Sequence, residues 1–188
     1  MGLRSYLKKP TPKKLHNLRI KARKKLSILE KEGLVDLGLK EFMKKSSKVR
    51  DIDVLLKICK NKKAKKHLKE KRKKVQKKLF KFIKNFKSHI VKMPQKKFDC
   101  DLSFLNECFL GKNEKELHKI RIMVKKCRYS ENLENLKPLQ DALGKMHDYY
   151  NCERLLIKLK QNPKKAVKKK QKWLKKAEKI RINLTKSK

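Results

Sequence analysis

Apolar residues recur at three- and four-residue intervals along most of the chain, a spacing that places them on one face of an α-helix. No segment alternates convincingly between apolar and polar residues, so the pattern predicts an all-α fold. Helices are expected at residues 13–32, 34–45, 49–60, 62–90, 98–110, 114–129 and 137–160, with a last basic helix beyond Pro163.

Short signals mark the ends of the first helices. Thr11 can cap the helix at 13–32 and Pro12 suits its first turn, while Gly33 is expected to stop it. Ser46-Ser47 interrupts the apolar pattern between the helices at 34–45 and 49–60. The first helix is therefore the best defined of this half of the chain.

Two of the predicted helices carry a row of cations beside their apolar face. At 100° per residue the later row falls within a sector about 80° wide. The earlier helix repeats the same offsets, with a His followed by Arg three residues later and a cation seven residues later. The rows comprise His118, Arg121, Lys125 and Arg128 in the later helix, and His16, Arg19 and Arg23 in the earlier one. A further lysine follows at the aligned positions Lys126 and Lys24.

A second pair of segments supports the repeat. Val49-Arg50-Asp51 aligns with Met146-His147-Asp148 after one length change of a few residues, so His147 stands where the first copy has Arg50. The chain is therefore expected to be a tandem repeat. Its parts are an N-terminal arm at 1–12, a first helical repeat at 13–93, a second at 94–162, and a basic C-terminal helix and tail at 163–188.

The charge balance identifies the class of partner. The chain has 59 Lys and Arg against 18 Asp and Glu, a net charge of +41 that destabilises a compact state by self-repulsion and favours polyanions. Like charges at helical spacing cost about a few tenths of a kcal/mol each. The rows of cations therefore do not stabilise their helices. An anion that lies across a row would explain why the cations are placed there.

The repeated motifs resemble those of the CHAD family, the conserved histidine α-helical domain. The second half matches through H-x-x-R-x-x-x-K-K-x-R-Y at 118–129 and L-Q-D-x-L-G-x-x-x-D at 139–148, and the first through H-x-x-R-x-x-x-R-K at 16–24 and V-R-D-I-D-V-L-L at 49–56. The resemblance implies two antiparallel helical bundles related by a pseudo-twofold axis, forming one compact domain. It also implies a central basic groove or pore that binds inorganic polyphosphate, and an association with polyphosphate granules.

Polyphosphate presents a series of negative charges and no bases, so its receptor needs many cationic donors and no stacking surface. Arginine offers forked hydrogen bonds to phosphate oxygens, and lysine acts as a point charge. Carboxylates near the row are expected to orient the basic groups, or to act as ordinary caps and ion pairs. The expected polyphosphate ligands are His16, Arg19, Arg23, Lys24, Arg50, His118, Arg121, Lys125, Lys126, Arg128 and Tyr129, and the expected carboxylates are Asp51, Asp53, Asp141 and Asp148.

The five cysteines show no C-x-x-C pair and most fall at helix-buried positions, so neither a disulfide framework nor a zinc site is expected. No run of 18 apolar residues occurs, so a membrane span is not expected. The protein is expected in the cytoplasm, where the resemblance implies polyphosphate granules as one location, and no cofactor is expected. Its oligomeric state is left open.

Two other functions compete with polyphosphate binding. Nonspecific nucleic-acid binding is favoured by the net charge, although Phe82, Phe86 and Trp173 follow apolar stripes and do not interleave with the basic ones. An enzyme acting on phosphates would need a glycine-rich loop or clustered carboxylates. The five glycines are scattered, and Asp51 and Asp53 at i, i+2 point to different helix faces. The sequence therefore predicts a non-catalytic binder.

Overall fold

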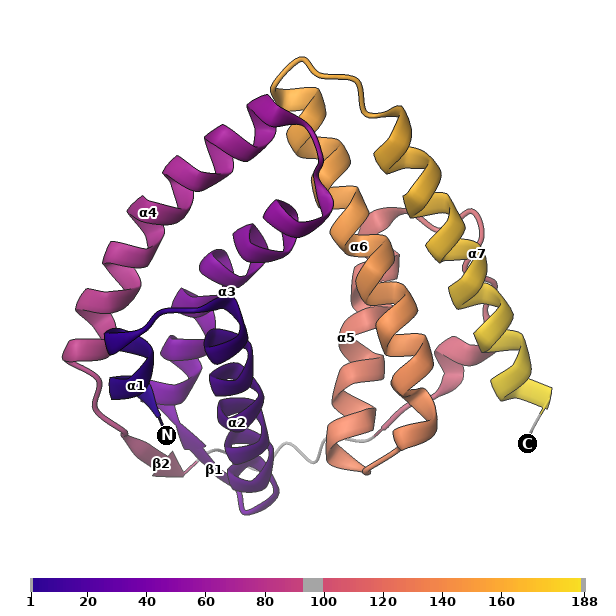
Figure 1. The fold of residues 1–188 in the computed structure, drawn as a ribbon. Helices are drawn as coiled ribbons and strands as arrows, with labels where there is room; N and C mark the ends of the chain where they lie inside the picture. The colour runs from indigo at the N-terminus through magenta and orange to yellow at the C-terminus, as the bar shows by residue number, and fades with distance from the viewer. Residues whose placement is uncertain (1, 93–99, 187–188) are drawn as a thin grey trace. The chain divides into compact units, whose positions relative to one another are not determined.

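The computed structural model describes residues 2–92 and 100–186, and these are mostly helical, as the pattern predicts (Figure 1). The described residues form seven α-helices, packed in antiparallel fashion. The chain divides into two compact units, 1–97 and 98–188, each with a hydrophobic core of its own. The expected boundary at Pro94 and the start of the expected helix at 98–110 lie outside the described residues.

Unit 1 contains four helices and two short strands. The strands pair antiparallel, with Val35 opposite Val91. The elements are α1 (Leu3–Lys8), α2 (Pro12–Lys31), β1 (Leu34–Asp36), α3 (Leu37–Ile58), α4 (Lys62–Lys84) and β2 (Ile90–Lys92).

The signals predicted for α2 are confirmed. The Thr11 side chain accepts a hydrogen bond from Lys14 N at 3.2 Å, and Pro12 occupies the first turn. Gly33 follows the helix with φ +69°, a left-handed conformation that glycine adopts without strain. These local signals were sufficient to predict the ends of α2, because each acts within a few residues of the helix end.

Three expectations for unit 1 are wrong. The N-terminal arm contains α1, whose Leu3 and Tyr6 are buried in the unit core. The helix expected at 34–45 is preceded by β1, and it does not stop at Ser46-Ser47 but continues to Ile58. Ser46 is tolerated inside α3 because it is fully buried, with its hydroxyl accepting a bond from a neighbouring helix.

Unit 2 contains three long helices, α5 (Glu114–Ser130), α6 (Lys137–Lys158) and α7 (Lys164–Lys186). Asn113 and Glu116 form a capping box at the start of α5, and Pro138 lies in the first turn of α6, where its missing N–H costs no helical hydrogen bond. The expected helix at 98–110 is wrong for the described residues. Only a single 3-10 turn, η1 (Ser103–Asn106), occurs there, and a second one, η2 (Glu134–Leu136), precedes α6.

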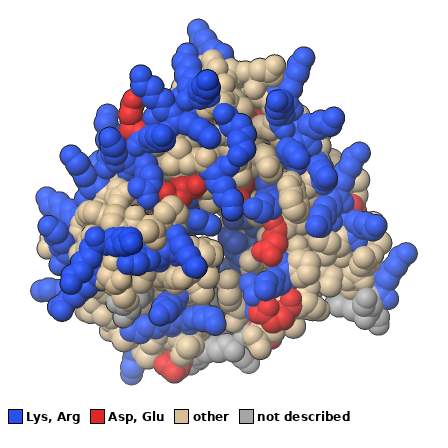
Figure 2. Space-filling view, viewed as in Figure 1, with Lys and Arg blue, Asp and Glu red and all other residues tan. Residues whose placement is uncertain are grey.

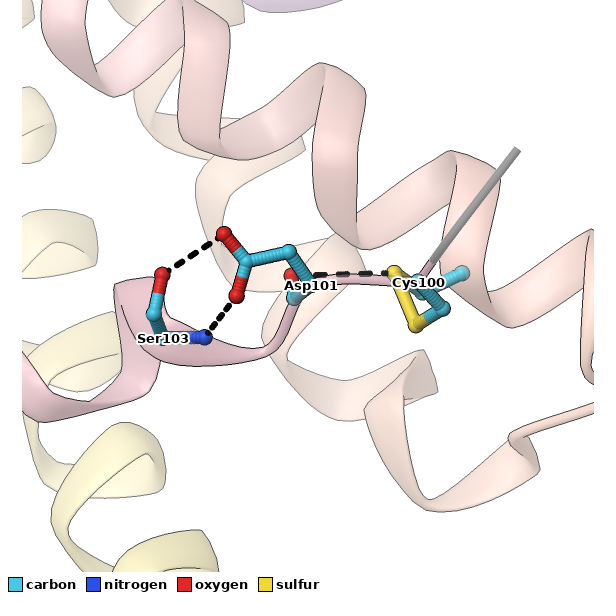
Figure 3. The surroundings of a disulfide bond; sticks show 4 residues. Cys100, Asp101 and Ser103 are labelled. Atoms are coloured by element: carbon cyan, nitrogen blue, oxygen red, sulfur yellow. Dashed lines mark hydrogen bonds between the residues drawn. A yellow bond between two sulfur atoms is a disulfide. The ribbon is translucent and has the colours of Figure 1, made fainter. Parts of the chain in front are cut away.

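A disulfide joins Cys100 to Cys127 in unit 2, with their Cα atoms 5.1 Å apart (Figure 3). The expectation that these cysteines are not bonded is therefore wrong. Next to it, the Asp101 carboxylate accepts hydrogen bonds from the backbone N–H and the hydroxyl of Ser103, both at 2.8 Å. The disulfide and this turn fix the start of the described part of unit 2 against α5.

Candidate anion-binding site

In unit 1 the predicted cations lie along the edge of α2 that meets α3. The apolar residues predicted beside these cations are buried, namely Leu15, Leu18 and Ala22. Their burial fixes the rotation of α2 about its axis. On the facing helix, Arg50 is half-buried and acts electrostatically on His16 across the α2–α3 boundary. The motifs at 16–24 and 49–56 thus lie on two helices that are in contact.

Arg19 joins the two helices of this site. Its Nη1 donates to the backbone oxygen of Met43 at 2.7 Å and to the hydroxyl of Ser46 at 2.6 Å. Burial, followed by the charges of Arg23 and Arg50, lowers the pKa of Arg19 to about 10, against an opposing effect of Asp51. Arg19 is therefore charged at neutral pH, and part of its donor capacity is used to hold α2 on α3.

His16 is surrounded by guanidinium groups. Its pKa is lowered first by burial and then by Arg50, Arg23 and Arg19, in that order. Three arginines that act on one imidazole show that positive charges are concentrated here. The imidazole is consequently neutral at physiological pH in the protein without a ligand.

In unit 2 the predicted cations lie on α5, which packs against α6. The rings of His118 on α5 and His147 on α6 lie side by side, with centroids 5.2 Å apart, and the Tyr150 ring lies 6.2 Å from that of His147. Arg121 and Lys125, one and two turns along α5, lower the pKa of both histidines. The predicted ligands His118, Arg121 and Lys125 therefore act on a common point.

His147 is a candidate ligand that the sequence reasoning did not include. Burial lowers its pKa to about 4, with Arg121, His118 and Lys125 acting in the same direction. The available signal was its alignment with Arg50, which stands at the same place in the first repeat. The alignment identified the position, but only the packing of α5 on α6 shows that it faces the cationic row.

Arg128 and Tyr129 have partners inside unit 2. Arg128 Nη2 contacts both carboxylate oxygens of Glu134 at 2.9 Å, its Nη1 lies 3.4 Å from Gln140 Oε1, and its guanidinium lies 5.1 Å from the centroid of the Tyr129 ring. A bound anion would have to compete with Glu134 for this arginine. Arg128 is thus a weaker candidate for direct contact with phosphate than its place in the cationic row suggests.

The carboxylates expected around the rows have different surroundings. The negative charge of Asp51 acts on Arg19 and opposes the lowering of the arginine pKa. Asp53 is 7% exposed and pairs with Arg72 of α4, whose Nε lies 2.5 Å from its Oδ1, so it serves the α3–α4 contact. Asp141 is exposed and Asp148 half-buried on α6.

The remaining predicted ligands belong to a broad basic surface. Lys24 and Lys126 are exposed, and Figure 2 shows lysine and arginine side chains spread widely over the visible face, with few acids among them. Within residues 2–92 and 100–186, no helix is long and apolar enough to cross a membrane. In the same residues, no three His, Cys, Asp or Glu side chains are grouped so that they could hold a metal ion.

No protein-family model matches the chain, and comparisons with curated proteins and with solved structures find no match. The resemblance to the CHAD family therefore rests on the repeated motifs and on no wider similarity.

Proposed function

We propose that the protein is a non-catalytic receptor for inorganic polyphosphate, which it binds through the cationic faces of its two helix pairs, α2–α3 and α5–α6. The observation that carries the proposal is the same in both units. Several cationic groups lie close enough to one imidazole to lower its pKa together with burial, at His16 in unit 1 and at His147 in unit 2. Such repulsion is unfavourable in the free protein and is relieved when phosphates neutralise it.

The finer form of the proposal follows the CHAD resemblance. The two helix pairs would be related by a pseudo-twofold axis, with both cationic faces directed at one central groove or pore. A chain of phosphates could then contact both faces at once, which increases affinity through effective concentration. Polyphosphates of graded length test this form, because affinity should rise sharply once the ligand is long enough to reach the second face.

A cytoplasmic location, including polyphosphate granules, is part of the proposal. The Cys100–Cys127 disulfide favours another compartment, because disulfides persist mainly in oxidising environments. Phosphate binding by cationic helix faces requires neither compartment. Fluorescence microscopy of the tagged protein beside a polyphosphate stain decides where it resides.

The test compares cations inside the two sites with cations outside them. Replacing Arg23 and Arg121 with Gln is expected to weaken polyphosphate binding at physiological salt by about tenfold or more, since charge-assisted hydrogen bonds contribute about 1.5–3 kcal/mol each. The matched control makes the same replacement at Lys168 and Lys172, which are exposed on α7, and so removes the same number of charges. It should weaken binding by less than about threefold. Fluorescence anisotropy with labelled polyphosphate measures both.

Equal losses in the two double variants would show that binding depends on net charge alone. Competition separates the proposed receptor from a nonspecific nucleic-acid binder, since counterion release rewards any basic surface. RNA at equal phosphate concentration should not displace bound polyphosphate, and displacement would contradict the proposal. Circular dichroism confirms that each variant is folded.

A further inference from the structure

Two imidazoles on facing helices form an unusual pair in unit 2. His118 is exposed on α5, His147 is half-buried on α6, and their rings are tilted by 40° with centroids 5.2 Å apart. Among the described residues, both imidazoles make ring contacts, and neither takes part in a hydrogen bond or an ion pair. Their ring nitrogens are therefore available to a ligand.

The charged groups that lower the pKa of this pair, after burial, are positive. From α5, Arg121 and Lys125 act on both imidazoles. On α6 itself the neighbour is Tyr150, and from α7 Lys170 lies 5.6 Å from the Tyr150 ring centroid. The nearby carboxylates are engaged elsewhere, since Lys170 pairs with Glu114 at 3.7 Å and with Glu153 at 2.8 Å.

Gly144 provides room beside the pair. It precedes His147 by three residues, so the two positions are neighbours on the surface of α6. A Cβ atom built at Gly144 would meet no described atom within 4 Å. The surface of α6 one turn before His147 is thus open.

We infer that His118 and His147, with Arg121 and Lys125, form a phosphate-binding site within unit 2 that takes up a proton from solution when it binds, so that this half of the receptor is sensitive to pH. The inference rests on the proposed function and deepens it. An incoming phosphate reverses the local electrostatic field and favours the imidazolium form, which donates a hydrogen bond from each ring nitrogen. No covalent bond of the ligand is formed or broken.

The two repeats would then differ in one respect. At the position of His147 the first repeat has Arg50, which is charged at any physiological pH. Unit 1 would have one imidazole at its site, His16, and unit 2 would have two, so phosphate binding by unit 2 would strengthen more steeply as the pH falls. When one proton is taken up, affinity rises by about tenfold for each pH unit of acidification.

The experiment measures proton uptake with tripolyphosphate as the ligand. Isothermal titration calorimetry near neutral pH, in two buffers of different ionisation enthalpy, gives the number of protons taken up per ligand bound. The variants are His147→Arg, which reproduces the residue of the first repeat, and His147→Asn, which keeps a polar side chain of moderate size. His67→Asn is the matched control, since His67 lies on α4 in unit 1.

Wild type and His67→Asn should take up protons to the same extent. Both His147 variants should take up fewer, by up to about one proton, and His147→Arg should retain affinity within about threefold. Proton uptake that is unchanged in both His147 variants would overturn the inference while leaving polyphosphate binding intact. The absence of binding by every variant, including wild type, would instead refute the proposed function. Agreement between the two His147 variants excludes misfolding of one of them.

Discussion

A Glu178→Gln variant should unfold at a markedly lower urea concentration than wild type, with a loss of about 3 kcal/mol. Glu178 on α7 is 7% exposed and accepts a hydrogen bond from Phe109 N at 2.9 Å. Arg181 donates to both of its carboxylate oxygens, at 3.0 and 2.7 Å, and also to Leu105 O at 2.6 Å. The carboxylate therefore holds the segment before α5 on α7, and its replacement leaves a half-buried arginine without its counter-charge.

The loss should depend on pH in a defined direction. Arg181, followed by the hydrogen bond from Phe109, lowers the pKa of Glu178 in spite of burial. A lowered carboxyl pKa stabilises the fold above the unfolded value and ceases to do so as the pH falls through the folded value. The difference between wild type and Glu178→Gln should therefore be full at neutral pH and should shrink in acid.

Trp173 gives a direct measurement, because it packs against the core of unit 2 and is the one tryptophan in the chain. Urea unfolding followed by its fluorescence reports on the unit that contains Glu178. The matched control is Glu107→Gln, which removes a carboxylate that is 58% exposed and paired with Lys112, and should cost less than about 1 kcal/mol. Equal midpoints for the two variants would contradict the role given to Glu178.

The parts of the fold that depend on near neighbours were predictable from the sequence. The bounds of α2 follow from Thr11, Pro12 and Gly33, and the start of α6 follows from Pro138, because these residues act within one turn. Apolar periodicity placed the long helices because one face of each helix is buried. Glu178 shows the limit of prediction from near neighbours. A single acid in a basic helix does not indicate which distant backbone group it will bind.

The errors occur where distant contacts override local preference. Ser46-Ser47 suggests a break, yet α3 continues because Ser46 is buried and accepts a bond from Arg19, a residue 27 positions earlier. The Cys100–Cys127 disulfide spans a similar separation, and cysteine spacing without a motif does not identify a partner. β1 and β2 are too short for an alternating pattern to be recognised.

The candidate site was predicted as two cationic helix faces, and the structure adds how each face is completed. The offsets of His, Arg and Lys placed His118, Arg121 and Lys125 on one side of α5. That His147 faces them depends on the register between α5 and α6, which the sequence of one helix does not contain. Likewise, periodicity could not separate Arg19, which holds α2 on α3, from a residue that is free to contact phosphate.

A Gly38→Ala variant should destabilise unit 1 by about 3 kcal/mol. A Cβ atom at Gly38 would lie 2.1 Å from the backbone oxygen of Lys87, so the segment before β2 would have to move. That segment is held by several bonds that would be strained together. Leu37 N donates to His89 O at 2.8 Å, and the fully buried Asp36 carboxylate accepts from the Ser88 hydroxyl and from His89 N.

The higher helix propensity of alanine opposes this loss of stability, but it is too small to reverse it. Alanine is favoured over glycine in a helix by about 1 kcal/mol, and less in a first turn, where Gly38 lies. The matched control is Gly144→Ala in the middle of α6, where a Cβ meets no described atom within 4 Å and the same preference should stabilise the protein by up to about 1 kcal/mol. Urea unfolding followed by circular dichroism measures both. If Gly38→Ala were as stable as Gly144→Ala, the segment at Lys87 could not lie against α3 as described.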